Sequence, residues 1–418
     1  MIIEAICADS ESVSRRHIQF DESTGLITAV GDNLGKADIS FGDECVLFAG
    51  MGDVHIHARE DASGNNCYKE DFHSAHAAMK NGGLTHAGDM PNNPIPPIDN
   101  SSYEEKFALA QKACGDLWLY AGIGPGTKPL SYSVPYKVYM GPSVGELFFK
   151  DLSTLDETLN RYQGLSVSFH CEDPEILEEY KGREHHHQRR PVKAEVVATR
   201  DALMLIEKYQ LKGKLCHYSS GEGLNLIREA RKRGVQVEIE VTPQHLFFDI
   251  DHLSQESWSR FQMNPPIRSE SDRNELLEAL KNGEINYLAT DHAPHTKEEK
   301  QKGISGLTGL DTYASFVGWL YHQGVDLKLI AKITAENPGD FHNRFLDSWK
   351  KISKAHAGFG RGVGYLRPGY RASFTVLDLK ASTLIDEAFL KTKVGHSPFQ
   401  GIELPGKLKA LYIGGKKA

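Results

Sequence analysis

Two kinds of hydrophobic pattern follow one another along this chain of 418 residues. Over residues 2–50, short stretches of alternating apolar and polar residues are separated by turn-forming segments such as Asp-Glu-Ser-Thr-Gly at 21–25. This pattern is typical of a small antiparallel β unit. From about residue 51, runs of apolar and β-branched residues alternate with longer segments in which apolar residues recur at helical spacing.

Eight apolar runs in this second part predict strands. They cover residues 52–57, 84–90, 117–123, 136–141, 165–172, 214–220, 235–242 and 285–291. Intervening segments, such as 70–83, 191–210 and 223–234, have the spacing of amphipathic helices. Eight strand and helix repeats over about 240 residues predict an α/β fold of the (β/α)₈ TIM-barrel type, which usually takes about 250 residues.

β patterning returns in the tail, at residues 369–379 and 410–415. We interpret the tail as the second half of the β unit that begins the chain. The predicted organisation is therefore a barrel over residues 51–345 and a small β-sandwich domain formed by residues 1–50 together with residues 346–418.

Polar side chains fall at corresponding places in five of the predicted strands. They are His55, His57, Lys137, His170, His217 and Asp291. Residues two apart in a strand point the same way, and polar residues at the carboxyl ends of barrel strands are typical of active sites. Imidazoles and carboxylates are ligands for zinc or a similar divalent ion. A buried lysine needs a compensating group, and a carbamate formed from carbon dioxide on Lys137 would let it bridge two ions.

Composition excludes several other classes of protein. The net charge of -8 and the pI near 6.2 give no broad basic surface for nucleic acid. Six scattered cysteines without a C-x-x-C pair argue against a disulfide framework or a zinc ribbon. No apolar stretch is long enough for a membrane span, and the first residues lack the pattern of a secretion signal. We therefore expect a cytoplasmic protein without a membrane or nucleic-acid partner.

Several motifs together resemble those of the cyclic amidohydrolases, and most of all the dihydroorotase family. The motifs are DVHIHARE, DMPNNPIPP, KVYMG, FHCED, RRPVKAE, CHYSS, VTPQH, MNPPIR and TDHAPHTKEEK, between about residues 50 and 340. The resemblance implies that His55, His57 and Asp291 hold one of two divalent ions, expected to be Zn²⁺. It implies that His170 and His217 hold the other, that carbamylated Lys137 bridges them, and that Asp291 also transfers the catalytic proton.

The resemblance also implies a substrate, and residues that bind it. Arg59, Asn92 and His295 match the family positions that hold a substrate carboxylate, and Asn264 matches a position that contacts the pyrimidine ring. The implied reaction is the reversible cyclisation of N-carbamoyl-L-aspartate to L-dihydroorotate in pyrimidine biosynthesis. The implied assembly is a homodimer, with association to an aspartate transcarbamoylase left open.

Two other functions stay open from sequence. A related cyclic amidohydrolase, such as a dihydropyrimidinase, hydantoinase or allantoinase, would not need Arg59, because its substrates lack the carboxylate. A non-catalytic partner subunit would lack one or more of the metal ligands, and none is missing here.

Three further segments carry weaker expectations. The histidine-rich segment at His185–His187 is expected in a solvated loop. Cys171 and Cys216 each adjoin a proposed ligand, so strand alternation predicts that they point away from the barrel mouth. Residues 141–147 are the candidate for a loop that closes over substrate.

Overall fold

The computed structural model describes residues 1–113, 116–142, 147–353 and 358–418. Cys114 and residues 143–146 of the candidate closing loop lie outside the described residues. The strands are β1 (Ile2–Ala8), β2 (Val13–Asp21), β3 (Leu26–Gly31), β4 (Ile39–Ser40), β5 (Cys45–Ala49), β6 (Met51–Ile56), β7 (Leu84–Asp89), β8 (Leu117–Leu119), β9 (Ala121–Ile123), β10 (Tyr136–Tyr139), β11 (Ser166–His170), β12 (Lys212–Leu215), β13 (Val237–Val241), β14 (Tyr287–Leu288), β15 (Phe374–Leu384), β16 (Glu403–Ile413) and β17 (Lys416–Lys417).

Helices follow most of the strands of the central part. They are α1 (Phe72–Asn81), α2 (Asn100–Ala113), α3 (Leu152–Leu159), α4 (Pro174–Tyr180), α5 (His186–Arg189), α6 (Val192–Tyr209), α7 (Leu224–Lys232), α8 (Pro243–Phe247), α9 (Glu270–Lys281), α10 (Lys297–Gln301), α11 (Tyr313–His322), α12 (Leu327–Ala331), α13 (Asn337–Asn343) and α14 (Leu346–Ser353), with a π-helical segment at Lys332–Glu336. The predicted helices at 70–83, 191–210 and 223–234 are α1, α6 and α7.

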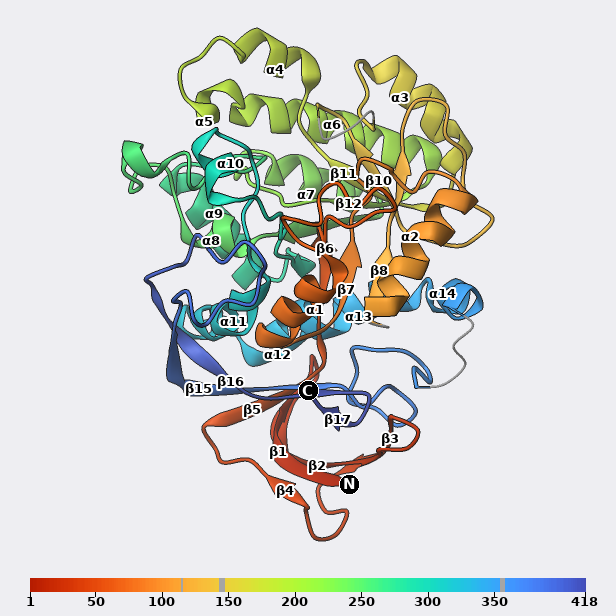
Figure 1. Cartoon of the computed structure of the whole chain (residues 1–418), viewed down its shortest axis with the longest axis vertical. Helices are drawn as coiled ribbons and strands as arrows, with labels where there is room; N and C mark the ends of the chain where they lie inside the picture. Colours follow the sequence, from red (N-terminus) through yellow and green to blue (C-terminus); the bar gives the residue numbers. More distant parts are fainter. Residues whose placement is uncertain (114–115, 143–146, 354–357) are drawn as a thin grey trace.

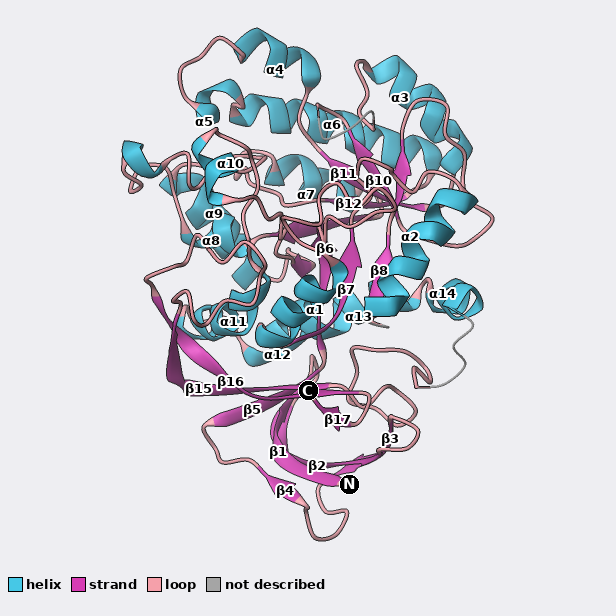
Figure 2. Ribbon diagram, in the orientation of Figure 1, coloured by secondary structure: helices cyan, strands magenta, loops and turns pink. Residues whose placement is uncertain are grey.

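The central strands form the predicted barrel (Figures 1 and 2). Strands β6 to β8 pair in parallel, and so do β9 to β14. Tyr120 alone separates β8 from β9, so these two short strands fill one position in the ring. The ring closes where the backbone N–H of His57 donates to the carbonyl of His292 at 2.7 Å. All eight predicted strands are present, and the (β/α)₈ prediction is confirmed.

The helices cover the barrel with one apolar face each. In α6, buried residues recur at helical spacing, at Ala198, Ala202, Leu205 and Tyr209. Because these positions lie three or four residues apart, they form one stripe against the strands while polar residues face outward. Packing of this kind fixes the strands, and therefore the loops at their carboxyl ends.

The two ends of the chain share a second, antiparallel-rich sheet below the barrel (Figure 1). Its order is β17-β16-β15-β5-β1-β2-β3, with β4 beside β1. Strand β5 therefore lies between β1 and β15. The sheet curls around its own apolar core, because Phe20 of β2 contacts Phe374 of β15 at 5.5 Å between ring centroids although two strands separate them in the sheet. The boundaries of the two predicted domains remain predictions.

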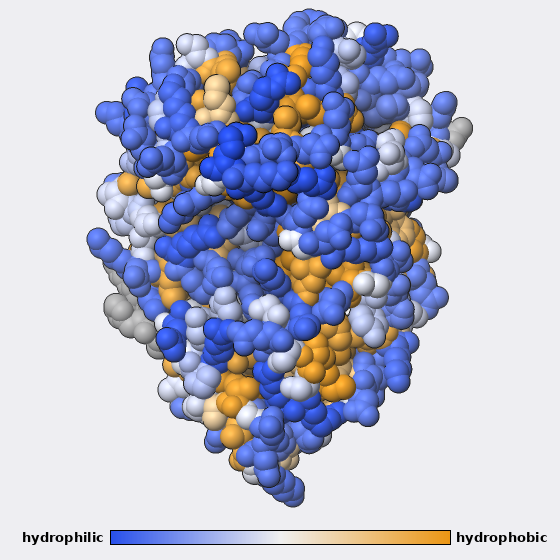
Figure 3. All heavy atoms as spheres, turned by 180° about the vertical axis from the view of Figure 1, so that it is seen from behind, coloured by the Kyte–Doolittle hydropathy of each residue, from blue (hydrophilic) through white to orange (hydrophobic). Residues whose placement is uncertain are grey.

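The face of the molecule that Figure 3 shows is mainly hydrophilic. The face turned away from the viewer in Figure 1 carries separate apolar patches within a hydrophilic surround (Figure 3). Among the residues that the structure describes, no helix has both the length and the apolar character to cross a membrane.

Candidate active site

A cavity of about 300 Å³ opens at the carboxyl ends of the barrel strands. Nine of the ten side chains singled out from sequence line it: His55, His57, Arg59, Asn92, His170, His217, Asn264, Asp291 and His295. The tenth, Lys137, is completely buried in β10 next to the cavity. The fold thus brings together residues from seven strands or the loops that follow them, while their individual roles remain predictions.

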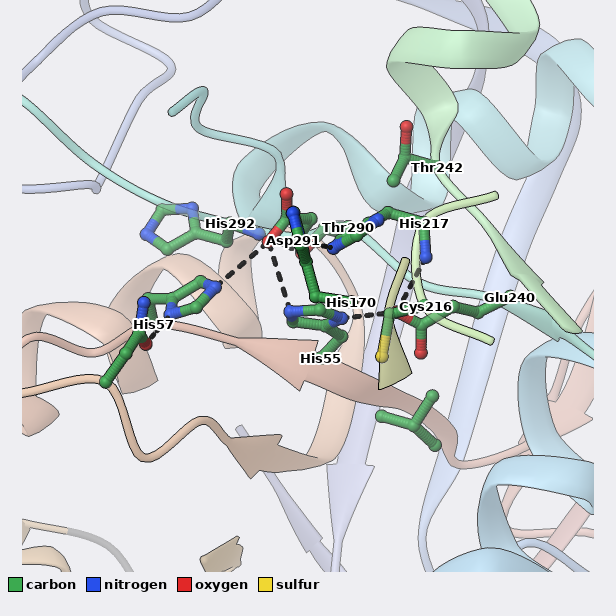
Figure 4. Close-up of polar contacts among 12 residues, drawn as sticks. His55, His57, His170, Cys216, His217, Glu240, Thr242, Thr290, Asp291 and His292 are labelled. Carbon is green, nitrogen blue, oxygen red and sulfur yellow. Dashed lines mark hydrogen bonds and ion pairs between the residues drawn. The ribbon is translucent and has the colours of Figure 1, made fainter. Parts of the chain in front are cut away.

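The imidazoles and the aspartate form a compact group at the base of the cavity (Figure 4). Oδ1 of Asp291 lies 3.2 Å from Nε2 of His55 and 3.0 Å from Nε2 of His57. Nδ1 of His170 lies 3.0 Å from Nε2 of His217. These five side chains therefore present a carboxylate oxygen and four ring nitrogens toward one another.

Three of the four imidazoles are oriented by an acceptor on the outer side of the ring. Nδ1 of His57 donates to Oδ1 of Asn92 at 2.7 Å, and Nε2 of His170 donates to Glu172 at 2.8 Å. Nδ1 of His55 donates to Glu240. A neutral imidazole has only one N–H, so in these three rings the inner nitrogen keeps its lone pair. Outer acceptors of this kind are characteristic of metal-binding histidines, and the donor set fits divalent cations.

Lys137 is the least conventional member of the group. Its Nζ atom has no hydrogen-bond partner among the described residues, and it lies 5.2 Å from the centroid of the Tyr139 ring. Burying an ammonium without an anion or acceptor costs several kcal/mol. A group that adds negative charge at Nζ and attracts cations would remove this cost, which fits the predicted carbamate and metal ions.

Burial sets the protonation of the site. It lowers the pKa of His55, His57 and His217 well below the usual value. The positive charge of Lys137 lowers all three pKa values further, and that of Arg59 lowers the pKa of His57. Burial also raises the pKa of Asp291 to about 7. At neutral pH the imidazoles are therefore neutral, which is the form that binds a metal ion.

Two buried carboxylates support the imidazoles, and sequence reasoning missed both. Glu240 contacts His55, accepts the backbone N–H of His217 at 3.0 Å and forms an ion pair with Lys214. Glu172, next to Cys171, is paired with Arg190. A charged residue inside a strand that is otherwise apolar, as in VEIEV at 237–241, was the available signal, because a buried carboxylate requires partners.

The backbone leaves the extended conformation at three residues of the site. Arg59, His217 and Asp291 have φ angles of 65°, 35° and 47°. Such left-handed conformations are uncommon outside glycine and cluster at functional sites. They turn the three side chains toward the cavity just after strands β6, β12 and β14 have ended.

The prediction for Cys216 is therefore wrong. Lys214 points into the barrel, where it pairs with Glu240, and Cys216, two residues further, lies on the same side, with Sγ 4.0 Å from Lys214 Nζ. Figure 4 shows Cys216 among the side chains of the site. His217 reaches the site through its left-handed backbone and not through strand alternation.

The remaining polar residues of the cavity face its outer part. Nη2 of Arg59 lies 3.2 Å from Nε2 of His295. Oδ1 of Asn264 and the hydroxyl of Tyr139 are buried and have no partner among the described residues. Gly303–Gly306 also line the cavity, and Gly306 lies against the ring of His295. The Arg59 guanidinium gives the cavity a positive charge beside His295, while Asn264 and Tyr139 offer unpaired hydrogen-bonding groups.

The expectation of a solvated loop at His185–His187 is also wrong. Residues His186–Arg189 form the short helix α5, and all three histidines are partly buried. Nε2 of His186 donates to the carbonyl of Met263 at 2.9 Å, next to Asn264. The rings of His185 and His187 both contact Trp258, at 4.6 and 4.8 Å between centroids. The segment therefore supports the loop that carries Asn264.

Comparison with curated proteins gives relatives described as dihydroorotases. The chain is 31% identical over 401 residues to a dihydroorotase from Thermococcus kodakarensis, covering 94% of this chain and 88% of the relative. It is 30% identical over 403 residues to a dihydroorotase from Shouchella clausii, covering 89% and 86%. A search of family models gave no match.

Solved structures with the same fold include hydantoinases. An L-hydantoinase (dihydropyrimidinase) from Arthrobacter aurescens superposes with a TM-score of 0.85 at 22% identity, covering all of this chain and 95% of that one. A D-hydantoinase (dihydropyrimidinase) from Thermus sp. gives a TM-score of 0.80 at 20% identity, covering 100% and 94%. At this level of identity the likeness concerns the fold, a barrel with an attached β domain.

Proposed function

This chain belongs to the dihydroorotase family of cyclic amidohydrolases, and we propose that it interconverts N-carbamoyl-L-aspartate and L-dihydroorotate with the help of two divalent metal ions. Cyclisation consumes one proton and releases one water, because a carboxylate becomes part of a ring amide. The product is an intermediate of pyrimidine biosynthesis, which we propose as the role of this enzyme.

One observation carries the choice of substrate. Beside the proposed metal ligands, the guanidinium of Arg59 lies 3.2 Å from the ring of His295, and its Nε atom has no hydrogen-bond partner among the described residues. Bidentate binding of a carboxylate is the interaction for which a guanidinium is best suited. Dihydroorotate carries such a carboxylate, whereas dihydrouracil, hydantoin and allantoin do not. The amide of Asn92, whose oxygen is already bound to His57, is placed to donate to the same anion.

The residues that would hold the metal ions fall into two groups. His55, His57 and Asp291 would bind one ion, and His170 and His217 the other, with the carbamate of Lys137 between them. When bound, the ions lower the pKa of water and polarise the carbonyl of the substrate. Zn²⁺ is our proposal for the native ion, because neutral imidazoles and carboxylates are its usual ligands.

Asp291 is the residue of this chain that moves the proton. It is 6% exposed, and its carboxylate faces the two imidazoles at the base of the cavity. In ring opening it takes a proton from the attacking water and delivers it to the ring nitrogen that leaves. In cyclisation it takes the proton from the attacking ureido nitrogen and delivers it to the departing oxygen. Oδ1 of Asn264 can accept a hydrogen bond from a ring N–H of dihydroorotate, whether dihydroorotate is the substrate or the product.

A substrate panel tests this function. Zinc-loaded protein is assayed by ultraviolet absorbance with dihydroorotate, dihydrouracil, hydantoin and allantoin at equal concentration. We expect turnover of dihydroorotate and negligible turnover of the three uncharged rings. Preferential turnover of an uncharged ring would assign the chain to another activity on this fold, and no turnover of any ring would assign it to the non-catalytic class.

Assembly and location stay proposals of the same kind. We propose a homodimer in the cytoplasm, and association with an aspartate transcarbamoylase as a second assembly to be tested. Light scattering after size-exclusion chromatography, with and without the transcarbamoylase, measures both assemblies. A single monomeric peak in both runs would overturn them.

A further inference from the structure

The Nδ1 atom of His295 has two neighbours of opposite kind. Nζ of Lys69 and Oε2 of Glu299 each lie 3.3 Å from it. A lysine ammonium can only donate a hydrogen bond, and a carboxylate can only accept one. Nδ1 therefore has a partner whether or not it carries the proton. On the other side of the ring, Nε2 faces Arg59.

These neighbours correspond to the two tautomers of a neutral imidazole. With the proton on Nδ1, His295 donates to Glu299, and Nε2 accepts from Arg59. With the proton on Nε2, Nδ1 accepts from Lys69, and Nε2–H and the guanidinium become two donors directed at the same space. Two adjacent donors without an acceptor are the arrangement that a carboxylate completes.

His295 stays neutral in both states. Burial lowers its pKa well below the usual value, and the Arg59 and Lys69 cations act in the same direction, while Glu299 opposes them. Lys300 lowers the pKa of His295 further. The choice at neutral pH is thus between two tautomers, and it is made by the partner at Nδ1.

We propose that Lys69 is a positioning residue that lets His295 present Nε2–H to the carboxylate of an anionic cyclic substrate. This inference rests on the proposed function and adds a specificity-determining residue to it. Without Lys69, Glu299 is the partner left at Nδ1 among the described residues, so the ring would present a lone pair toward the substrate. A lone pair repels a carboxylate, which weakens substrate binding.

Lys69 is itself held in place by neighbours that do not depend on His295. Its Nζ lies 3.0 Å from Oε1 of Glu299, which also accepts from the hydroxyl of Tyr68 at 2.7 Å. The next residue, Glu70, accepts from Oγ1 of Thr392 at 2.6 Å. The Tyr68–Glu299 and Glu70–Thr392 hydrogen bonds do not involve the Lys69 side chain, so the loop should keep its place in a Lys69→Met variant.

A double-mutant cycle between Lys69 and His295 tests the proposal. We expect Lys69→Met to raise KM for dihydroorotate about tenfold, the effect of one charge-assisted hydrogen bond, while kcat changes less than about threefold. In a His295→Ala background, Lys69→Met should raise KM no further. In the protein that retains His295, Lys69→Arg should keep most of the substrate binding that Lys69→Met loses. Equal effects in both backgrounds, or an unchanged KM in the single variant, would overturn the proposal.

Two controls separate this outcome from other failures. Lys393→Met removes another ion pair of the same loop, between Lys393 and Asp71 at 2.6 Å, without touching His295, and should leave KM within about twofold. If the wild-type protein does not turn over dihydroorotate, the proposed function is wrong. If the wild type is active but Lys69→Met leaves KM unchanged, the role of Lys69 is wrong.

A spectroscopic measurement reports the tautomer directly. In ¹⁵N NMR of histidine-labelled protein, the His295 signals are identified by their loss in His295→Ala. We expect dihydroorotate to give the Nε2–H form in the wild type and the Nδ1–H form in Lys69→Met. The same tautomer in both proteins would overturn the proposal.

Discussion

Nδ1 of His170 lies 3.0 Å from Nε2 of His217, at the ends of the neighbouring strands β11 and β12. The opposite nitrogen of His170 is already committed to Glu172. The pair is therefore arranged to bind a cation from two sides.

Loss of one member of this pair should release one metal ion. We expect His217→Asn to bind about one divalent ion per chain and the wild type about two, because the first group of ligands is left intact. Inductively coupled plasma mass spectrometry after dialysis measures the content. His73→Asn, on the exposed face of α1, should keep both ions, and a full complement in His217→Asn would contradict the assignment.

Glu240 should control metal affinity through His55. In Glu240→Gln the carboxylate that accepts from Nδ1 of His55 is lost, and we expect metal affinity to fall about 10- to 100-fold. The variant also leaves Lys214 as an unpaired buried cation, which lowers Tm. Chelator competition and thermal unfolding measure the two effects separately.

A second substitution distinguishes the two roles of Glu240. Glu240→Gln combined with Lys214→Met removes both buried charges, so Tm should recover toward the wild-type value while metal affinity stays low. Recovery of metal affinity in the double variant would show that Glu240 acts on charge balance alone.

Arg59 should discriminate between charged and uncharged rings. Arg59→Met removes the guanidinium that faces His295, and we expect kcat/KM for dihydroorotate to fall about 100-fold. Turnover of dihydrouracil, which we expect to be negligible in the wild type, should stay within about threefold of its wild-type value, and metal content should not change. A loss of metal in this variant would mean that Arg59 has a structural role in the cavity.

Tyr139 should affect activity and stability in opposite directions. Its hydroxyl is buried, lines the cavity and has no partner among the described residues, and burial raises its pKa so that it remains a donor. We expect Tyr139→Phe to lower kcat/KM about tenfold by removing a hydrogen bond to a substrate oxygen. Tm should stay equal or rise, because an unpaired buried polar group is removed. A lower Tm with unchanged kcat/KM would place the hydroxyl in a structural role.

Glu195 should make the stability of the protein depend on pH. Burial raises its pKa to about 7 from 4.5, although Arg268 and the Ser219 hydrogen bonds oppose the shift. The folded state therefore holds the proton more tightly than the unfolded state. This contribution to stability is complete below about pH 4.5 and is lost as the pH rises through about 7.

Comparison with Glu195→Gln isolates this contribution. We expect the variant to gain about 3 kcal/mol in free energy of unfolding relative to the wild type between about pH 4.5 and pH 8. Urea unfolding at several pH values measures the difference. A constant difference across this range would show that the wild-type carboxyl is not titrating in the folded state.

The barrel strands and the six candidate metal ligands could be predicted because both depend on local patterns. The four candidate substrate-binding residues, Arg59, Asn92, Asn264 and His295, were predicted from the resemblance to dihydroorotases. Apolar periodicity is read within one strand or helix, and the mouth of a barrel collects the ends of all its strands. The local pattern does not show which of the two glutamates of β13, Glu238 or Glu240, is buried at the site. Both alternate with apolar residues, but only the fold shows that Glu240 faces the barrel interior while Glu238 is partly exposed.

Contacts between distant segments explain the other failures. Lys69 lies in a loop without any pattern of its own and meets His295, 226 residues away, only in the folded chain. Cys216 was misplaced because strand alternation gives no warning of the left-handed backbone at His217. In both cases the tertiary structure, and not local preference, decides where the side chain points.

The shared sheet below the barrel has a consequence for synthesis on the ribosome. The backbone N–H of Met51 bonds to the hydroxyl of Thr375, 324 residues later, and β5 finds its antiparallel neighbour only in β15. While the nascent polypeptide is being extended, one side of β5 has backbone groups that no native neighbour can yet bind. An unpaired strand edge is a template for association with other chains. Translation that stops before β15 should therefore leave a product that aggregates or requires a chaperone, even though its barrel sequence is complete.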